Sequence, residues 1–447
     1  MIQANSKNLA YLTVALIATI MILTLFMLSS ESVLTLAAIG LVALACLIAW
    51  RPAWGVYVLV FCLPLINLNF TLSWMIIPFV DALAIVCLIG FIFYLIIHPA
   101  EIKNLKFPFF IPFVVFCLAT VISALLGPHI NFSLWYVARW IIFFYLAYVW
   151  FPVNVIKDKL ILKGVLLSFA LSGLAMAIMG VISLKDQTIL YDPFRFTVLT
   201  IGGDKIFGLD QNLLVETLLP AIFFLLAYRF LIKNQFDKKL VIIINLFLIF
   251  VLLGTFSRGG WISFLICLAI YIFYGKKASL KQIILVGAIS LLLLSPLFIQ
   301  MFRLQTAYEV GVGSNRTRWL STQIAWSNFI DRPLFGQGTG EYVNLINKNI
   351  RYIAQHGQGT DSNGLVQKIM AENGLAGILS FFFLAFYIFY NFYFHLKKDK
   401  AQSVYTFPIY LGALSIFLFE FVNTSYYHGK MWLPIAIAWS AMQLNKK

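Results

Sequence analysis

The sequence predicts an all-α polytopic membrane protein with about 12–14 transmembrane helices and one large loop subdomain that contains short helices. Two observations carry this prediction. The chain has 447 residues, of which 62% are hydrophobic and 11% are charged, and its mean hydropathy is +0.92. Its apolar runs recur at roughly 17–25 residues, which is the length that a helix needs to cross a bilayer.

Each apolar run is expected to be one span, and the loops between the runs fix the topology. The first run follows "MIQANSKN", lacks a small-residue cleavage site and is long enough to span, so we expect it to be retained. Clusters of lysine fall in alternate loops, which by the positive-inside rule places both termini in the cytoplasm. The expected spans are 8–30, 33–50, 54–71, 75–97, 107–126, 132–152, 160–183, 213–232, 239–254, 260–275, 281–300, 374–396, 405–423 and 430–444.

Four regions follow from this topology. They are N-terminal transmembrane helices (1–200), a transmembrane core (201–300), a large non-cytoplasmic loop (301–373) and C-terminal transmembrane helices (374–447). In the large loop, "RWLSTQIAWSNFI" has the spacing of a helix on the membrane surface. "SNGLVQKIMAENGL" predicts a short helix from Ser362 to Glu372 that stops at Asn373-Gly374.

Net charge and cysteines exclude other classes. The formal net charge of +15 comes from dispersed basic residues, so the pattern does not indicate a nucleic-acid partner. All five cysteines lie in apolar runs, where they are expected to be small buried hydrophobes without disulfides or a metal-binding spacing.

Arginines gather on the outer side of the predicted topology, whereas lysines dominate the cytoplasmic loops. The guanidinium fork binds phosphate or carboxylate bidentately and stays charged. In "TFSRGGWISFL", Arg258 begins a span and precedes two glycines, which would let a lipid headgroup approach a helix N-terminus. The alternative is that Arg258 joins two helices by pairing with Asp210 or Glu216. The outer arginines are Arg195, Arg258, Arg303, Arg316, Arg318, Arg332 and Arg351.

The same stretch resembles the Ser-Arg-Gly signature of the O-antigen ligase and polymerase superfamily. These bacterial membrane glycosyltransferases use glycans carried on undecaprenyl diphosphate. Three further stretches resemble the family in chain order: "GLDQNLLVETLLP" (208–220), "RWLSTQIAWSNFIDRPLFGQGTGEY" (318–342) and "SNGLVQKIMAENGLAGIL" (362–379). The resemblance covers about residues 200–380, and the N-terminal half matches in hydropathy alone.

The resemblance implies a donor site. Arg258 and Arg318 would hold the diphosphate of the lipid donor and stabilise the charge that accumulates as it leaves. No divalent metal and no other cofactor would then be needed, which agrees with the absence of a clustered Asp/His pattern in the sequence. Trp319 would offer a surface for sugar stacking, or would belong to an aromatic belt at the membrane edge. The other expected substrate-binding residues are Ser257, Asn212, Asn363 and Glu216.

The general base is the point at which this sequence departs from the family. The family's closing motif has a histidine before the asparagine, and here that position is Ser362, a poor base at neutral pH. Asp361 and His356 are the candidate replacements, although Asp361 also suits a helix cap. Loss of the histidine favours a repeat-unit polymerase over a ligase. Other ionisable residues inside spans, Asp81, Arg139 and Glu420, are expected to join helices.

The expected function is therefore glycan transfer from undecaprenyl diphosphate to a sugar hydroxyl, on the periplasmic side of the bacterial inner membrane. The acceptor would be another glycan or lipid A-core, with membrane lipid and a chain-length regulator as further partners and no nucleic acid. A ligase to lipid A-core and a protein O-oligosaccharyltransferase remain alternatives, because they share the donor chemistry. A flippase is the rival class, but no inverted repeat is visible and the polar motifs cluster on one face.

Overall fold

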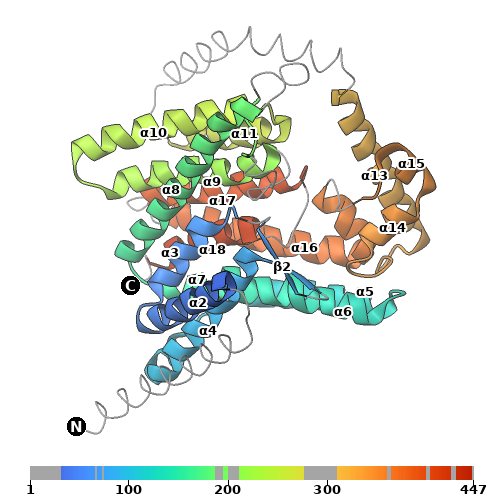
Figure 1. The fold of residues 1–447 in the computed structure, drawn as a ribbon, viewed down its shortest axis with the longest axis horizontal. Coiled ribbons are helices and arrows are strands. Elements are labelled where there is room, and N and C mark those ends of the chain that lie inside the picture. Colours follow the sequence, from blue (N-terminus) through green and yellow to red (C-terminus); the bar gives the residue numbers. More distant parts are fainter. Residues whose placement is uncertain are drawn as a thin grey trace.

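The computed structural model shows a helical membrane protein, as the sequence predicts, and its described residues add one short β-hairpin to the helices (Figure 1). Within the part of the chain that the structure describes, four helices are long and apolar enough to cross a membrane, and shorter apolar helices accompany them. The four are α4 (Phe79–Ile97), α8 (Lys159–Ile182), α9 (Gln211–Leu231) and α16 (Leu365–Lys398). The expected spans 8–30 and 281–300 lie outside the described residues. The described residues are 32–65, 68–72, 75–186, 195–199, 211–275, 310–359, 364–398, 403–423 and 429–444.

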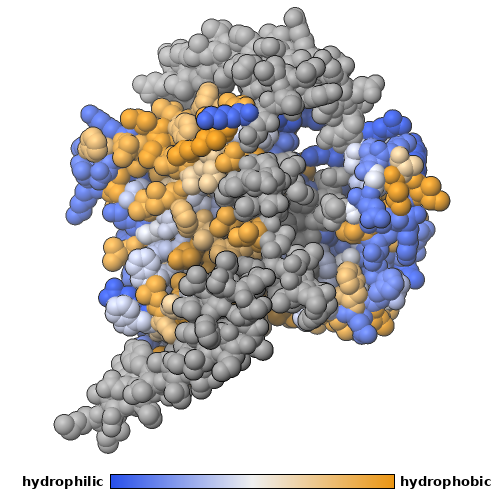
Figure 2. Space-filling view, viewed as in Figure 1, coloured by the Kyte–Doolittle hydropathy of each residue, from blue (hydrophilic) through white to orange (hydrophobic). Residues whose placement is uncertain are grey.

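Large apolar side chains cover the outside of the helices. Ile111, Leu160 and Phe273 are each more than 70% exposed, and hydrophobic residues dominate the helices at the left of Figure 2. A surface of this kind is expected where lipid, and not water, surrounds the protein. It supports the assignment of the helical body to the membrane.

The N-terminal helices depart from the prediction at one point. Helix α3 ends at Cys62, although a span to residue 71 was expected. Pro64 cannot continue the helix because it lacks an N–H donor. An antiparallel hairpin follows, in which Asn69 pairs with Pro78. The elements are α2 (Ser32–Trp50), α3 (Ala53–Cys62), β1 (Asn69–Leu72), β2 (Met75–Pro78), α4 (Phe79–Ile97) and the 3₁₀ helix η1 (Pro99–Asn104).

The next spans include an irregular helix. The stretch predicted as the span 132–152 is helical, but two of its segments are π-helices, and Arg139 lies in the first. Asp158 begins the following helix by accepting a hydrogen bond from the Ile161 N–H at 2.8 Å. The elements are α5 (Phe110–Leu126), α6 (Ile130–Val137), the π-helices η2 (Ala138–Ile142) and η3 (Tyr145–Trp150), α7 (Phe151–Val155), α8 (Lys159–Ile182) and the 3₁₀ helix η4 (Ser183–Asp186).

Helices α9 and α18 form the centre of the body. Nearly every described residue of α18 is buried, and α9 packs between α8 and α17. A helix that is buried on all sides carries apolar residues around its whole circumference. This explains why the sequence of α18 shows no amphipathic face. The elements are α9 (Gln211–Leu231), α10 (Gln235–Gly254), α11 (Arg258–Gly275), α17 (Ser403–Glu420) and α18 (Gly429–Gln443).

Three helices of the large loop form a unit beside this body, at the right of Figure 1. Hydrophilic residues gather on this α13–α15 unit in Figure 2. Its helices are α13 (Val310–Asp331), α14 (Tyr342–Lys348) and α15 (Ile350–His356). A small core separate from that of the body is made of Leu320, Ile324, Ala325, Tyr342, Ile346 and Tyr352 of this unit, together with Ala371 of α16.

A clamp of backbone contacts joins the α13–α15 unit to α16 (Leu365–Lys398). Helix α16 is broken at Gly374, whose φ is 61°, so the predicted stop at this residue is confirmed. Around the break, the segment 333–338 exchanges four backbone hydrogen bonds of 2.8–3.0 Å with the segment 371–376. Thr339 continues the clamp by donating its hydroxyl to the carbonyl of Thr120 in α5, at 2.8 Å. We refer to these contacts as the glycine clamp.

Candidate functional site

The Ser-Arg-Gly turn connects α10 to α11 and places Arg258 at its tip. Phe256 adopts a left-handed conformation with φ 53°, which reverses the chain between the helices. The Ser257 hydroxyl then accepts a hydrogen bond from the Gly260 N–H at 3.4 Å and caps α11. Arg258 is the first residue of α11 and is exposed.

The two glycines that follow allow helices to pack closely. A Cβ at Gly259 would lie 2.6 Å from Cγ2 of Val422, and a Cβ at Gly260 would lie 2.6 Å from Cγ1 of Val215. The sequence suggested that a lipid headgroup would approach these residues. The structure fills the side of each glycine where a Cβ would stand with side chains of α9 and of the residues that follow α17, so the two glycines serve helix packing. The approach of a headgroup to their backbone N–H groups stays a prediction.

Asn212 and Ser257 bring two helix N-termini together. The Ser257 hydroxyl donates to Oδ1 of Asn212 at 3.0 Å, which joins the first turns of α9 and α11. Each helix N-terminus carries partial positive charge, equivalent to about half an elementary charge. Two of them beside Arg258 form a place that favours an anion.

Arg195 adds a second guanidinium group to this turn. Its Nε donates to the carbonyl of Thr255 at 3.0 Å, and the N–H of Phe196 donates to the carbonyl of Gly254 at 2.9 Å. Both carbonyls belong to the C-terminus of α10, where cations are favourable. The sequence analysis placed Arg195 on the outer face without assigning it to the site. Its contact with Thr255 depends on the path of the non-helical segment 195–199, which no local sequence pattern indicates.

Glu216 lies one turn further into α9, where it pairs inside the protein. Its carboxylate is 3.0 Å from Nζ of Lys430, and it also accepts a hydrogen bond from the Asn423 side chain. Both Glu216 and Lys430 are at most 1% exposed. The pair joins α9 to α18 beneath the Ser-Arg-Gly turn. The sequence analysis missed Lys430, although a lysine at the start of an apolar run is a detectable signal.

Helix α13 carries Arg318 and Trp319. Arg318 is half-buried and Trp319 is 65% exposed. The hydroxyl of Thr317 lies 3.1 Å from Nδ1 of His356, so the fold brings His356 to the residue next to Arg318. Asp361, Ser362 and Asn363 lie outside the described residues.

The turn with Arg258 and the helix with Arg318 lie at the same end of the helical body. Gly259 packs against the end of α17, and Gly364, just before α16, lies beside the carbonyl of Phe421, just after α17. Helix α16 in turn contacts α13, because the Gln367 side chain donates to the Thr322 hydroxyl at 2.5 Å. These contacts connect the two arginine-bearing helices through α16 and α17.

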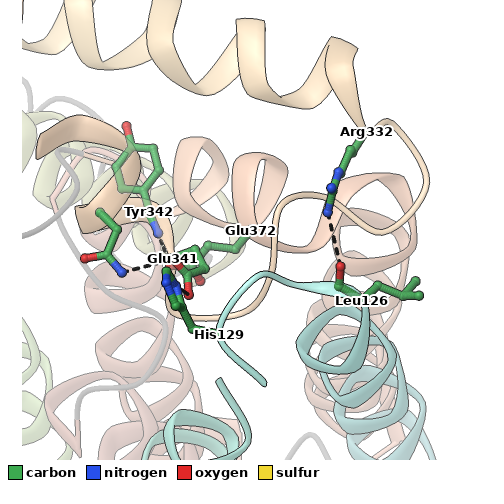
Figure 3. A network of polar contacts seen from close by, with 7 residues as sticks. Leu126, His129, Arg332, Glu341, Tyr342 and Glu372 are labelled. Atoms are coloured by element: carbon green, nitrogen blue, oxygen red, sulfur yellow. Dashed lines mark hydrogen bonds and ion pairs between the residues drawn. The ribbon is translucent and has the colours of Figure 1, made fainter. Parts of the chain in front are cut away.

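A second set of polar residues surrounds the glycine clamp (Figure 3). Glu341, which is 1% exposed, lies 2.8 Å from Nδ1 of His129. Nη1 of Arg332 donates to the carbonyl of Leu126 at 3.1 Å, and the N–H of Tyr342 donates to Glu372 at 3.2 Å. The sequence analysis assigned none of these residues to the site.

Two further ionisable residues, Lys368 in α16 and Asp81 in α4, are buried. Lys368 is 1% exposed, and its Nζ lies 5.7 Å from the ring centroid of Tyr136. Asp81 accepts a hydrogen bond from the Tyr148 hydroxyl at 3.1 Å and so links α4 to η3, as expected of a residue that joins helices. Among the described residues, no three His, Cys, Asp or Glu side chains come together as a metal-ligand set.

Comparison with known proteins gives two matches. Residues 243–382 match the model of a family described as O-Antigen ligase. The chain is also 22% identical over 264 residues to "Teichuronic acid biosynthesis protein TuaE" of Bacillus subtilis (strain 168). That alignment covers 53% of this chain and 51% of the relative, so the chain spans about half the length of this curated protein. The family match contains Arg258, Arg318 and the clamp segments 333–338 and 371–376, but not Thr120 of α5.

Proposed function

Since this chain belongs to the O-antigen ligase and polymerase superfamily through the domain at residues 243–382, we propose that it is a glycosyltransferase of surface polysaccharide biosynthesis. It transfers a glycan from undecaprenyl diphosphate to a sugar hydroxyl at the periplasmic face of the bacterial inner membrane. The reaction extends a lipid-linked polysaccharide by repeat units and uses no metal ion.

The meeting of two helix N-termini at the Ser-Arg-Gly turn is the observation that carries the proposal. The bond from Ser257 to Asn212 holds these N-termini together, and Arg258 stands at the first residue of α11. A diphosphate at this place would face backbone N–H groups and a guanidinium fork. The interactions of the diphosphate with these N–H groups and with the guanidinium group strengthen as the glycosidic bond breaks, because negative charge then accumulates on the leaving group.

Arg318 supplies the second guanidinium group in this proposal. It lies on α13, which contacts α16 at the same end of the body as the Ser-Arg-Gly turn. Two guanidinium groups neutralise a diphosphate without the bridging cation that soluble sugar-nucleotide enzymes commonly need. Trp319, which is 65% exposed on the same helix, provides a stacking surface for the donor or acceptor sugar.

The acceptor separates the three related activities. A polymerase uses a second lipid-linked repeat unit, a ligase uses lipid A-core, and a protein O-oligosaccharyltransferase uses a serine or threonine hydroxyl. We favour the polymerase because Ser362 stands where the family's ligases carry a histidine. Both termini are cytoplasmic in this proposal, and a chain-length regulator is the expected protein partner.

Purified protein in liposomes tests the proposal. Lipid-linked repeat unit alone should yield a ladder of longer lipid-linked chains. Transfer that requires added lipid A-core, or an added protein acceptor, would replace the polymerase assignment with one of the other two. Movement of the lipid-linked sugar across the bilayer without any new glycosidic bond would contradict the enzyme assignment as a whole.

A further inference from the structure

We propose that His129 is the general base that accepts the proton of the acceptor hydroxyl, and that Glu341 holds its ring in position. This inference rests on the proposed glycan transfer and names a residue for a role that the sequence left open. His129 lies in the turn between α5 and α6, outside the stretches that resemble the family.

The two residues form a hydrogen-bonded pair at the glycine clamp (Figure 3). Nδ1 of His129 lies 2.8 Å from Oε1 of Glu341. The other carboxylate oxygen, Oε2, accepts a hydrogen bond from the Asn344 side chain at 2.9 Å. The Glu341 side chain is 1% exposed, whereas that of His129 is 54% exposed. The carboxylate is therefore fixed inside the protein and the imidazole faces outward.

This arrangement selects the tautomer that can act as a base. An ionised carboxylate only accepts hydrogen bonds, so in the proposed state, with Glu341 ionised, Nδ1 of His129 carries the proton of their contact. In a neutral ring, the lone pair then lies on Nε2. A buried carboxylate also stabilises the imidazolium that forms when Nε2 takes up a proton. Glu341 thus orients the ring and supports the charge that catalysis would place on it.

The backbone around the pair is held closely. A Cβ at Gly127 would lie 2.9 Å from Cα of Gly338, so the turn before His129 rests directly on the glycine clamp. The carbonyl of His129 accepts a hydrogen bond from the N–H of Ser133 at 2.9 Å, which fixes this residue at the start of α6. A base that must meet a hydroxyl in one geometry needs support of this kind.

The proposed step balances as follows. The acceptor hydroxyl gives its proton to Nε2 of His129 while its oxygen forms a bond to the anomeric carbon of the donor. The bond between that carbon and the diphosphate oxygen breaks, and the electron pair leaves with the diphosphate. The imidazolium of His129 afterwards releases the proton to water, and no other reactant is consumed.

His356 is less suited to this step. Its Nδ1 contacts Thr317, and its Nε2 is enclosed within the α13–α15 unit, where no described side chain or backbone group bonds to it. A base must reach the proton that it removes. The exposed ring of His129 meets that condition, and the enclosed Nε2 of His356 does not.

The test compares three variants of the full-length protein in liposomes supplied with lipid-linked repeat unit. His129→Asn keeps an amide at the position of Nδ1, so the bond to Glu341 is retained and only the base is removed. We expect its turnover to fall by about 10²-fold or more, with unchanged apparent affinity for the donor and an unchanged melting temperature. Imidazole added to His129→Ala should restore part of the turnover. His98→Ala is the matched control, because His98 also bonds a protein oxygen through Nδ1, at 3.1 Å, but lies at the C-terminus of α4.

The outcomes separate this inference from the proposed function. If the wild type transfers sugar and His129→Asn does so at the same rate, the assignment of the base is wrong and the glycosyltransferase remains. If His129→Asn loses activity only together with thermal stability, and imidazole rescues nothing, His129 is a structural contact and the inference is overturned. If the wild type transfers no sugar, the proposed function fails and this inference fails with it.

Discussion

Replacing Gly374 by alanine should open the glycine clamp. Gly374 has φ 61° and ψ −153°, a conformation that is essentially restricted to glycine. A Cβ there would lie 2.7 Å from the backbone atoms Gly336 N, Leu334 C and Pro333 O. Backbone atoms cannot rotate away as a side chain does, so the segment 333–336 or helix α16 must move.

The expected effect follows from two costs. The strained conformation costs about 1–3 kcal/mol for a residue with a Cβ, and overpacking adds about 1–3 kcal/mol. Even the lower sum, about 2 kcal/mol, raises the population of the opened clamp roughly 25-fold. Amide hydrogen exchange measures this directly, because the N–H groups of Gln337, Gly338, Leu375 and Ala376 donate across the clamp.

Gly357 provides the matched control. Its φ is 75°, but nothing lies within 4 Å of the position of a Cβ. Gly357→Ala therefore carries the conformational strain without the collision. Exchange across the clamp should accelerate in Gly374→Ala and stay unchanged in Gly357→Ala. Equal exchange in both variants, or protection in Gly374→Ala that matches the wild type, would refute the description of the clamp.

Three further predictions concern the bundle and the chemistry. Lys430→Met leaves the Glu216 carboxylate buried without its cation, so this variant should lower the free energy of unfolding by about 3–5 kcal/mol in a thermal unfolding assay. The double variant Glu216→Gln/Lys430→Met should recover most of that loss. A double variant that is no more stable than Lys430→Met would contradict the pairing. Ser257→Ala removes the cap of α11 and should cost about 0.5–2 kcal/mol in the same assay, and an unchanged melting temperature would argue against the cap. Glycan transfer should continue in EDTA, whereas loss of transfer that Mg²⁺ or Mn²⁺ restores would contradict the metal-independent mechanism.

The membrane helices were predictable from the sequence because their signal is local. An apolar run of sufficient length specifies a span wherever it occurs, and the order of α8 to α11 follows the predicted spans closely. The break in α16 was equally local, since Asn373-Gly374 follows a complete helical pattern. The predicted span 54–71 was too long, because α3 ends at Cys62, just before Pro64. The length of the apolar run alone does not show where a proline ends the helix.

Contacts between distant segments were not predictable in this way. His129 and Glu341 are 212 positions apart and meet only because α5, α16 and the α13–α15 unit share the glycine clamp. The packing of Gly259 and Gly260 was not predicted for the same reason, since the sequence does not reveal that Val422 and Val215 lie where their Cβ atoms would be. Single letters such as Lys368 and Lys430 become informative only when burial shows that their charges lie inside the protein.

The most direct test of the account is the rate of glycan transfer by Arg258→Lys and Arg318→Lys in liposomes. Lysine keeps the positive charge but loses the fork that grips two phosphate oxygens. Arg351→Lys is the control, because Arg351 is an exposed arginine of the same loop with no role in the proposed site. If Arg258 and Arg318 hold the donor diphosphate, Arg258→Lys and Arg318→Lys should lose most of their transfer activity, and Arg351→Lys should keep full activity. Full transfer by both Arg258→Lys and Arg318→Lys would contradict it.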